Sequence, residues 1–85
     1  MPNNHKENSN LLSCYIGTLI REIRLNKKLT EKDLANLLNI SQQQISRYER
    51  GKVKVDVEFL FKIIIVFQLD DEEKNNFLKK ISDKI

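Results

Sequence analysis

One short stretch of this 85-residue chain concentrates the side chains best suited to specific chemistry. It offers amide, hydroxyl and guanidinium groups within six positions: Gln42, Gln43, Gln44, Ser46 and Arg47. In the major groove of DNA, glutamine can bond an adenine edge bidentately and arginine a guanine edge. The residue types therefore predict contacts with DNA bases.

These side chains need a rigid element to present them, and the flanking residues predict a helix over Gln42–Arg50. Ser41 stands at the N-cap position, and Gly51 follows as the C-terminal stop. Within this helix Ile45 and Tyr48, three residues apart, are expected to face inward. The polar side chains are then left facing outward.

A second short helix is predicted immediately before it, over Glu31–Leu38. Thr30 is the expected N-cap, and Asn39 is the expected terminator because asparagine tolerates the left-handed conformation. An apolar face recurs at helical spacing through Leu34, Ala35, Leu37 and Leu38. The two helices are joined by a tight polar turn.

Positive charge gathers on and just after the second of these helices. The formal net charge of the chain is +3, and residues 41–54 carry four cations against one acid, Glu49. Lys52 and Lys54 in the following loop, together with Arg50, are expected to meet DNA phosphates. The alternative is an ordinary solvated basic loop.

A longer helix is predicted upstream, capped at Ser9 or Asn10 and running to about Asn26. Its apolar stripe is Leu12, Ile16, Leu19, Ile20 and Ile23. Gly17 inside this helix indicates a close helix contact, because glycine is otherwise unfavourable there. Residues 1–9 are expected to form a flexible tail, because Met1–Asn8 is polar without apolar periodicity.

Two further helices are predicted downstream. Asp56 should cap a fourth helix over Val57 to about Gln68, with its core face at Val57, Leu60, Phe61, Ile64 and Phe67. A fifth begins near Asp70–Glu73 and carries the stripe Phe77, Leu78, Ile81 and Ile85. Because the fourth helix is apolar on nearly every side, it should be buried on two sides.

Enzymatic, metal and membrane functions find no support in the sequence. There is no Ser-His-Asp or Cys-His set, no metal-ligand spacing and no glycine-rich phosphate loop. Cys14 is the only cysteine and His5 the only histidine, the latter in the expected tail. We therefore expect a cytoplasmic protein that is not an enzyme and has no cofactor, no metal, no membrane span and no evident small-molecule ligand.

The segment TEKDLANLLNISQQQISRYERG resembles the helix-turn-helix of phage repressor and Cro-like (XRE-type) regulators. Its flanks, IGTLIREIRLNKKLT and GKVKVDVEFLFKIIIVFQLD, resemble the first and fourth helices of that family, so the resemblance covers about Ile16 to Leu69. It implies an all-α fold, a compact five-helix bundle with the helix-turn-helix as helices two and three. Residues 10–85 would form this DNA-binding domain, including C-terminal dimerisation helices.

The resemblance also implies an ion pair between Arg24 and Glu49, with Arg24 contacting a phosphate; the alternative is two unrelated surface charges. This sequence departs from the family pattern at Asn39 (usually Gly), at Val55 (often Pro) and at Glu31 (commonly Gln). Of these departures, Glu31 bears on function, because it puts a carboxylate where the family often contacts a phosphate.

The implied function is a bacterial, sequence-specific transcriptional regulator of repressor type, acting as a homodimer on a two-fold symmetric site in double-stranded DNA. ISQQQISRYERG further resembles small regulators encoded with fimbrial operons of enteric bacteria, which would imply fimbrial or motility genes as targets. The expected dimer interface is apolar: Phe59, Val66, Phe77 and Ile81. Two alternatives stay open: that these residues bury each other within one chain, and that the protein is an antitoxin-like module that neutralises a partner protein.

Overall fold

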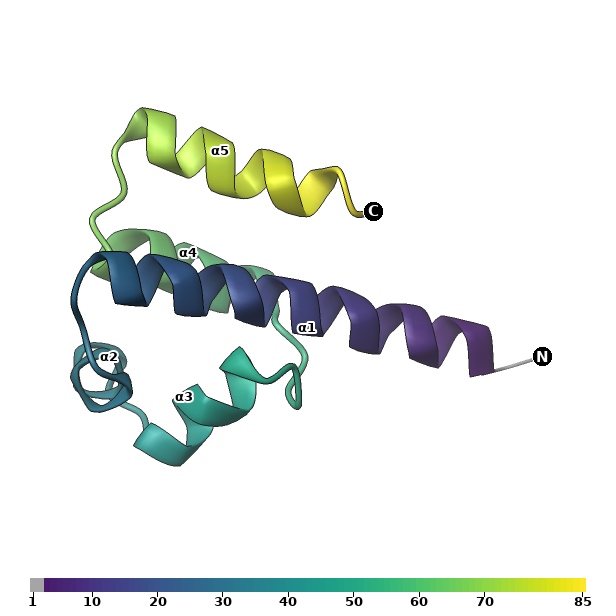
Figure 1. Cartoon of the computed structure of the whole chain (residues 1–85), viewed down its shortest axis with the longest axis horizontal. Coiled ribbons are helices and arrows are strands. Elements are labelled where there is room, and N and C mark those ends of the chain that lie inside the picture. Colours follow the sequence, from purple (N-terminus) through teal and green to yellow (C-terminus); the bar gives the residue numbers. More distant parts are fainter. Residues whose placement is uncertain (1–2) are drawn as a thin grey trace.

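The computed structural model contains five helices in the described part of the chain (Figure 1). They are α1 (Asn3–Asn26), α2 (Glu31–Leu38), α3 (Gln42–Glu49), α4 (Val57–Val66) and α5 (Asp71–Ser82). The structure describes the backbone of residues 3–85 and the surroundings of side chains from Leu11 onward. The predicted all-α, five-helix fold is confirmed within this range.

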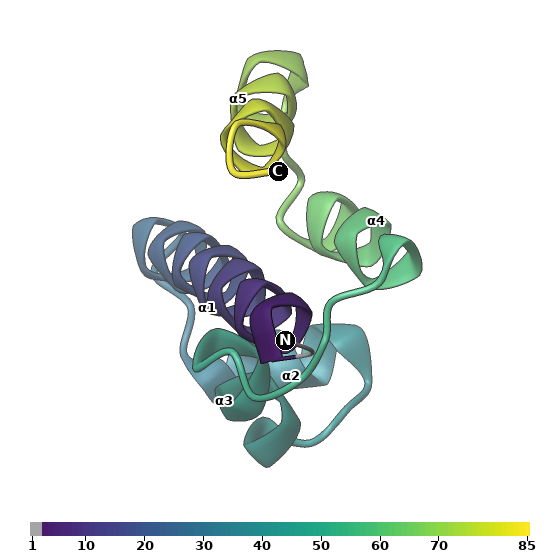
Figure 2. The ribbon, with the colours of Figure 1, turned by 90° about the vertical axis from the view of Figure 1, so that its right-hand side faces the viewer.

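Helix α1 is the central element of the fold. Figures 1 and 2 show α5 on one side of α1 and the α2–α3 pair on the other, with α4 completing the bundle. Direct packing joins α1 to α3 and to α5, and α2 to α3 and to α4. None of the described helices combines the length and the apolar character needed to cross a bilayer.

Helix α1 begins upstream of its predicted start. Ser9 and Asn10, the expected caps, both lie inside a helix that begins at Asn3. Residues 3–8 contain no proline or glycine, so the backbone hydrogen bonds of the helix can continue toward the N-terminus beyond the apolar turns. Hydrophobic periodicity cannot detect such a polar extension. The expected tail, residues 1–9, overlaps these turns. Its residues 1–2 and its side chains lie outside the description, and its flexibility stays a prediction.

The other helix ends follow the capping residues closely. The predicted caps Thr30, Ser41 and Asp56 each accept a hydrogen bond from the backbone N–H three residues later, and so does Asp70 before α5. Helix α3 ends one residue before the predicted Arg50, and α4 ends at Val66 rather than Gln68. Gln68 has a positive φ of 54°, which is incompatible with continuing α4.

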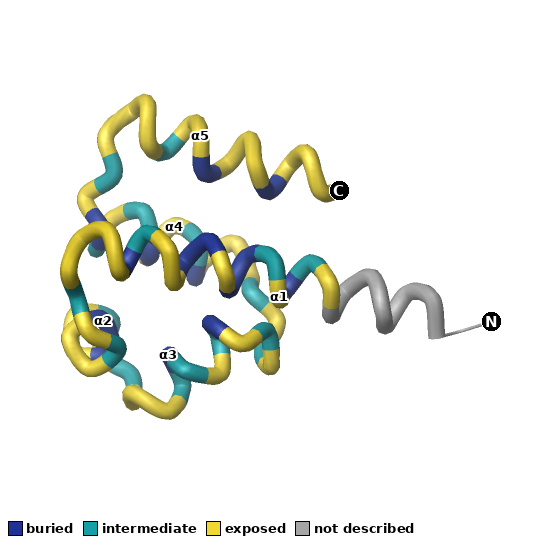
Figure 3. Tube along the Cα trace, in the orientation of Figure 1, coloured by how far each residue is buried: buried dark blue, intermediate teal, exposed yellow. Residues whose placement is uncertain are grey.

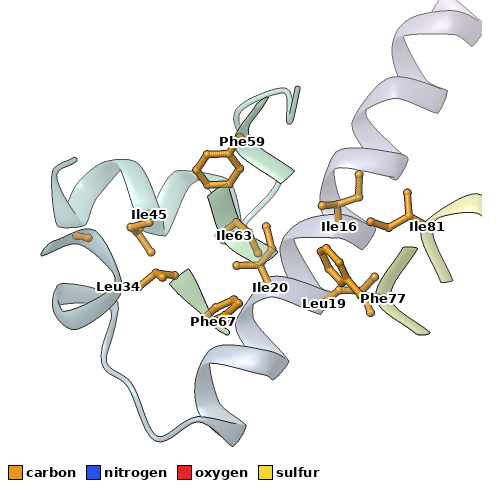
Figure 4. Close-up of a cluster of buried hydrophobic side chains, with 11 residues drawn as sticks. Ile16, Leu19, Ile20, Leu34, Ile45, Phe59, Ile63, Phe67, Phe77 and Ile81 are labelled. Atoms are coloured by element: carbon orange, nitrogen blue, oxygen red, sulfur yellow. The ribbon is translucent and has the colours of Figure 1, made fainter. Parts of the chain in front are cut away.

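The core is one apolar cluster to which all five helices contribute (Figures 3 and 4). Its most deeply buried large side chains are Ile20, Leu34, Ile45 and Ile63. Phe77 and Ile81 of α5 point toward Leu19 and Ile16 of α1 (Figure 4). Helix α5 is therefore held to the bundle mainly through α1.

The predicted core face of α4 is wrong at Val57 and Phe61, whereas Leu60, Ile64 and Phe67 do contact the core. Val57 and Phe61 are exposed, and Leu60 and Ile64 are half-buried. The buried residues are instead Phe59, Ile63 and Phe67, of which only Phe67 was predicted. Because α4 is apolar on nearly every side, the sequence contains no contrast from which the orientation of the helix could be read.

The residues of the expected dimer interface are packed within the single chain. Phe59, Phe77 and Ile81 keep at most 7% of their surface exposed and belong to the core of the single chain, and Val66 packs half-buried against it. Phe59 in addition stacks on Tyr48 of α3, with ring centroids 3.8 Å apart. These residues hold helices of one chain together, so they do not form the free apolar patch that was expected.

Candidate nucleic-acid interface

The turn between α2 and α3 is shaped by local hydrogen bonds. Thr30 and Asp33 form a reciprocal capping box at the start of α2, with both bonds 2.9 Å long. The bond from the Thr30 N–H to the Asp33 carboxylate lowers the pKa of Asp33 below its usual value. Asn39 adopts the predicted left-handed conformation, with φ 59° and ψ 42°.

The next residues start α3 at a defined angle to α2. The Ile40 N–H donates to the Ala35 carbonyl at 3.0 Å, which closes the end of α2 behind Asn39. The Ser41 hydroxyl accepts from the Gln44 N–H at 3.1 Å. The residues of the turn therefore provide hydrogen-bond partners for free backbone groups at the end of α2 and the start of α3. The direction of α3 is thus set by backbone geometry.

The inner face of α3 is fixed at three points. Ile45 is 1% exposed in the core, and Tyr48 stacks nearly parallel on Phe59 with an interplanar angle of 9°. The third point is the carboxylate of Glu49, which is buried. A helix held at its middle and at its C-terminal end can present its other side without reorganising.

Glu49 and Arg24 form the predicted ion pair. The Arg24 Nε donates to Glu49 Oε2 at 2.6 Å and the Arg24 NH2 donates to Oε1 at 3.0 Å, a bidentate geometry. The remaining Arg24 nitrogen, NH1, donates to the Leu29 carbonyl at 2.9 Å. The hydrogen bonds to Glu49 raise the pKa of Arg24 above its usual value.

The expected phosphate contact of Arg24 stays a prediction. Arg24 is only 7% exposed, and all three of its guanidinium nitrogens are engaged inside the protein. The pair joins α1 to the end of α3 and continues to the α1–α2 turn at Leu29. Arg24 therefore positions α3 through these contacts within the protein.

Gly17 permits the close approach of α1 to α3, as its place in the sequence predicts. A Cβ at this position would lie 2.3 Å from the Tyr48 carbonyl oxygen, which is part of the backbone. A similar contact occurs at Gly51, where a Cβ would lie 2.5 Å from the Cys14 sulfur. Gly51 also has a φ of 72°, which glycine adopts without strain.

The side of α3 that points away from the core carries exposed polar side chains. Gln43 and Arg47 lie opposite Ile45 on the helix, and Gln42 is exposed at its first turn. We call Gln42, Gln43 and Arg47 together the outer face of α3. Among the other predicted base contacts, Ser46 is half-buried at the edge of this face.

Gln44 is set apart from the outer face of α3. It is half-buried and lines a groove of about 190 Å³ between the α2–α3 turn and the start of α4, together with Tyr48 and Phe59. Its backbone N–H is already bonded to the Ser41 cap. The structure thus turns Gln44 toward α4, away from the direction of Gln43 and Arg47.

The predicted phosphate-contacting cations beyond Arg24 stay exposed at the end of α3. Arg50 lies at the C-cap, where its Nε is 3.4 Å from the Ser46 carbonyl oxygen. Lys52 and Lys54 follow in the exposed loop to α4. These three cations adjoin the outer face of α3 and form its basic margin.

Glu31 introduces a negative charge beside Glu49 and near Arg50, at the end of α3. It is half-buried in the first turn of α2, and burial together with the neighbouring Glu49 carboxylate raises the pKa of Glu31. Arg24 and Arg50 act in the opposite direction. The Glu31 carboxylate therefore lies close to the buried Arg24–Glu49 pair, in which Glu49 already neutralises Arg24.

Sites for other chemistry are not found among the described residues. Among the residues whose side chains are described, 11–85, no group of three or more His, Cys, Asp or Glu could hold a metal ion. Cys14 is exposed, with its sulfur 3.8 Å from the Arg50 carbonyl oxygen. His5 lies among the residues whose side chains are outside the description.

The comparison with protein families agrees with this geometry. The family model described as helix-turn-helix matches residues 20–74, which is more than half of the chain and includes both helices of the motif. No curated protein matches the chain significantly. The chain belongs to the XRE-type helix-turn-helix family of DNA-binding transcription regulators.

Proposed function

We propose that the protein regulates transcription by sequence-specific binding of DNA, with the outer face of α3 in the major groove. The observation that carries the proposal is the contrast between the two sides of α3. Ile45 and Glu49 are buried and fixed, whereas Gln43 and Arg47 stand exposed with no partner in the described structure. Amide and guanidinium groups held in this way suit direct readout of base edges.

Two groups of side chains divide the work in this proposal. Base contacts come from Gln42, Gln43 and Arg47, with Ser46 at the edge of the face and Gln44 able to join only by turning out of its groove. Phosphate contacts come from the basic margin of Arg50, Lys52 and Lys54. The first group supplies sequence preference, and the second supplies most of the salt-dependent affinity.

We further propose that two copies act together on a two-fold symmetric operator. One α3 offers three or four base contacts, too few to select a site among the many competing sites of a genome. Two copies related by a two-fold axis would place their α3 helices about one DNA turn, roughly 34 Å, apart. If the three cations of the basic margin each meet a phosphate, a dimer neutralises about six, and the slope of log affinity against log salt is roughly −5.

The likeness of ISQQQISRYERG to regulators encoded with fimbrial operons supports fimbrial or motility genes as targets. Such targets would place the activity in the bacterial cytoplasm. Mapping the binding sites of a tagged protein across the genome of its source tests this part. Sites upstream of such genes support it, and sites confined to unrelated genes contradict it.

Selection from a random pool of DNA duplexes tests the main proposal and does not require the operator to be identified first. The purified protein is incubated with duplexes carrying about 30 randomised base pairs, and bound DNA is sequenced after several rounds. The expected result is an enriched inverted repeat whose half-sites lie about 10 base pairs apart. Bound DNA with the same composition as the input pool would overturn sequence-specific recognition.

A further inference from the structure

Helix α4 carries an apolar ridge on the side away from the core. Val57, Phe61 and Ile65 are 64%, 57% and 71% exposed and recur every four residues, so they form one stripe along the helix. Phe61 lies two residues from both Phe59 and Ile63, which are buried. At 3.6 residues per turn this offset is roughly 200°, so the ridge lies opposite the core face.

The packing of the single chain leaves this ridge uncovered. Helix α4 packs against α2, and the face of α4 opposite the ridge lies in the core. Figure 2 shows α4 at the margin of the bundle, beside α1 and below α5. Three large apolar side chains in one exposed row are typical of an interaction surface.

Charges flank the ridge in a self-complementary order. Glu58 and Lys62, one turn apart, form an exposed pair at 3.4 Å on one border of the ridge. If two α4 helices pack antiparallel about a two-fold axis through Phe61, Val57 of one copy lies opposite Ile65 of the other. On the border, Glu58 of each copy then approaches Lys62 of its partner, and the favourable contact occurs twice.

A parallel arrangement lacks this complementarity, because its two-fold axis runs along the helices and brings Glu58 and Lys62 of each copy against the other border of the ridge, which is apolar (Leu60 and Ile64). We propose that the ridge Val57–Phe61–Ile65 is the two-fold contact between two copies of this chain, with their α4 helices antiparallel. The proposal rests on the proposed dimeric function and replaces the interface expected from the sequence, whose residues are buried.

The size of the ridge sets the strength of the contact. Each of its side chains leaves on the order of 100 Å² exposed, so two copies together cover roughly 600 Å². Stable interfaces cover about 1,200–2,000 Å², so the ridge alone supports a weak dimer. On DNA, two adjacent half-sites raise the effective concentration of the copies, and the weak contact becomes cooperative binding.

Phe61→Glu is the direct test, with Leu11→Glu as its matched control. Leu11 is also an exposed apolar residue (68%, against 57% for Phe61), it lies on a different helix, α1, and the two substitutions change charge equally. Each variant and the unmodified protein are studied by analytical ultracentrifugation and by titration against two duplexes from the selection above. One duplex holds the two-fold site, and the other holds a single half-site.

The expected result is two copies of the unmodified protein and of Leu11→Glu bound cooperatively to the two-fold duplex. Phe61→Glu should bind that duplex at least tenfold more weakly while keeping its affinity for the half-site. If Phe61→Glu binds both duplexes like the unmodified protein, the ridge is not the contact, although the proposed dimer stands. If the unmodified protein binds only one copy per two-fold duplex, the dimer itself is wrong, and a different partner covers the ridge.

Charge reversal tests the antiparallel arrangement separately. Glu58→Lys alone and Lys62→Glu alone each set like charges against each other across the two-fold axis, so each should reduce cooperativity severalfold. The double variant restores opposite charges and should return cooperativity to within about twofold of the unmodified protein. Thermal unfolding of the same variants controls for loss of the Glu58–Lys62 pair within one chain. Single variants without effect, or a double variant without recovery, would overturn the antiparallel contact.

Discussion

The outer face of α3 and the ridge on α4 are both exposed helix surfaces, yet their chemistry is opposite. The first presents Gln43 and Arg47, whose amide and guanidinium groups form directional hydrogen bonds. The second presents Phe61 between two aliphatic side chains, which form none. One surface suits the polar edges of bases, and the other suits an apolar surface like itself.

The two faces also differ in how the protein supports them. Behind the outer face of α3 lie the Arg24–Glu49 pair and the contact at Gly17, and both need α1 at a fixed distance. Behind the ridge lies Phe59, which stacks on Tyr48 of α3. Both exposed faces therefore depend on the packing of α3 against its neighbours. Substitutions in that packing should harm both faces, and substitutions on one exposed face should harm that face alone.

The largest effect is expected for Glu49→Ala, which should impair both faces. It leaves the Arg24 guanidinium buried without its counter-ion, and breaking a buried pair in this way costs about 3–5 kcal/mol. In chemical denaturation we expect the free energy of unfolding to drop by this amount. The drop is a considerable share of the total stability of a domain of this size.

The double variant Arg24→Met with Glu49→Leu serves as the control, because it removes both charges and keeps apolar volume. Its stability should recover most of the loss, since buried pairs are replaceable by packed apolar groups. Equal stability of Glu49→Ala and the unmodified protein would show that the pair does not hold α3.

A pair of substitutions two residues apart separates the two sides of α4. Phe59→Ala removes a buried ring from the contact with Tyr48 and should destabilise the protein by about 3–5 kcal/mol. Phe61→Ala removes an exposed ring and should change the free energy of unfolding of the monomer by no more than about 0.5 kcal/mol. Thermal or urea unfolding at low protein concentration measures both, and similar losses for the two variants would contradict the placement of the ridge.

The smallest effect is expected for Glu31→Gln, which removes a carboxylate beside Glu49 and near Arg50. Removing one charge near phosphate should tighten DNA binding by at most about 1 kcal/mol, the energy of two unit charges 4 Å apart in water. Titration at constant salt checks this, and unchanged or weaker binding would show that Glu31 does not oppose a phosphate.

The same variant should flatten the pH dependence of stability. Because the pKa of Glu31 is raised above its usual 4.5, the folded state keeps this proton to higher pH than the unfolded state. Stability should therefore fall as pH rises from 4.5 through the raised pKa, and Glu31→Gln should remove that fall. The opposite shift at Asp33 acts below its usual value of 3.8, outside this window.

The helix-turn-helix was predictable from sequence because its signals are local. A cap such as Thr30 or Ser41 acts within three residues, and Asn39 ends a helix through its own backbone conformation. The Arg24–Glu49 pair was predictable only through the family resemblance, since the two residues are 25 positions apart. The burial of the pair depends on the packing of α1 against α3 and left no mark in the sequence.

Helix α4 was not predictable in the same way. Its apolar residues occupy both faces. The composition therefore predicts that the helix is buried on two sides, but it does not show which face contacts which neighbour. The orientation follows from the stacking of Phe59 on Tyr48, a contact between helices. The four-residue recurrence of Val57, Phe61 and Ile65 was the available signal for a second face, and it is equally consistent with a core stripe.

The central claim is that the outer face of α3 reads base edges, and it is tested most directly by comparing Arg47→Ala with Lys52→Ala. Each variant is titrated by fluorescence anisotropy against the selected two-fold duplex and against duplexes with single base changes, at several salt concentrations. Arg47→Ala should lose about 1–3 kcal/mol on the selected site and all preference at one position of each half-site. Lys52→Ala should weaken binding to every duplex alike and make the salt slope shallower. If Arg47→Ala keeps the full base preference at every position, α3 does not read the site through this face.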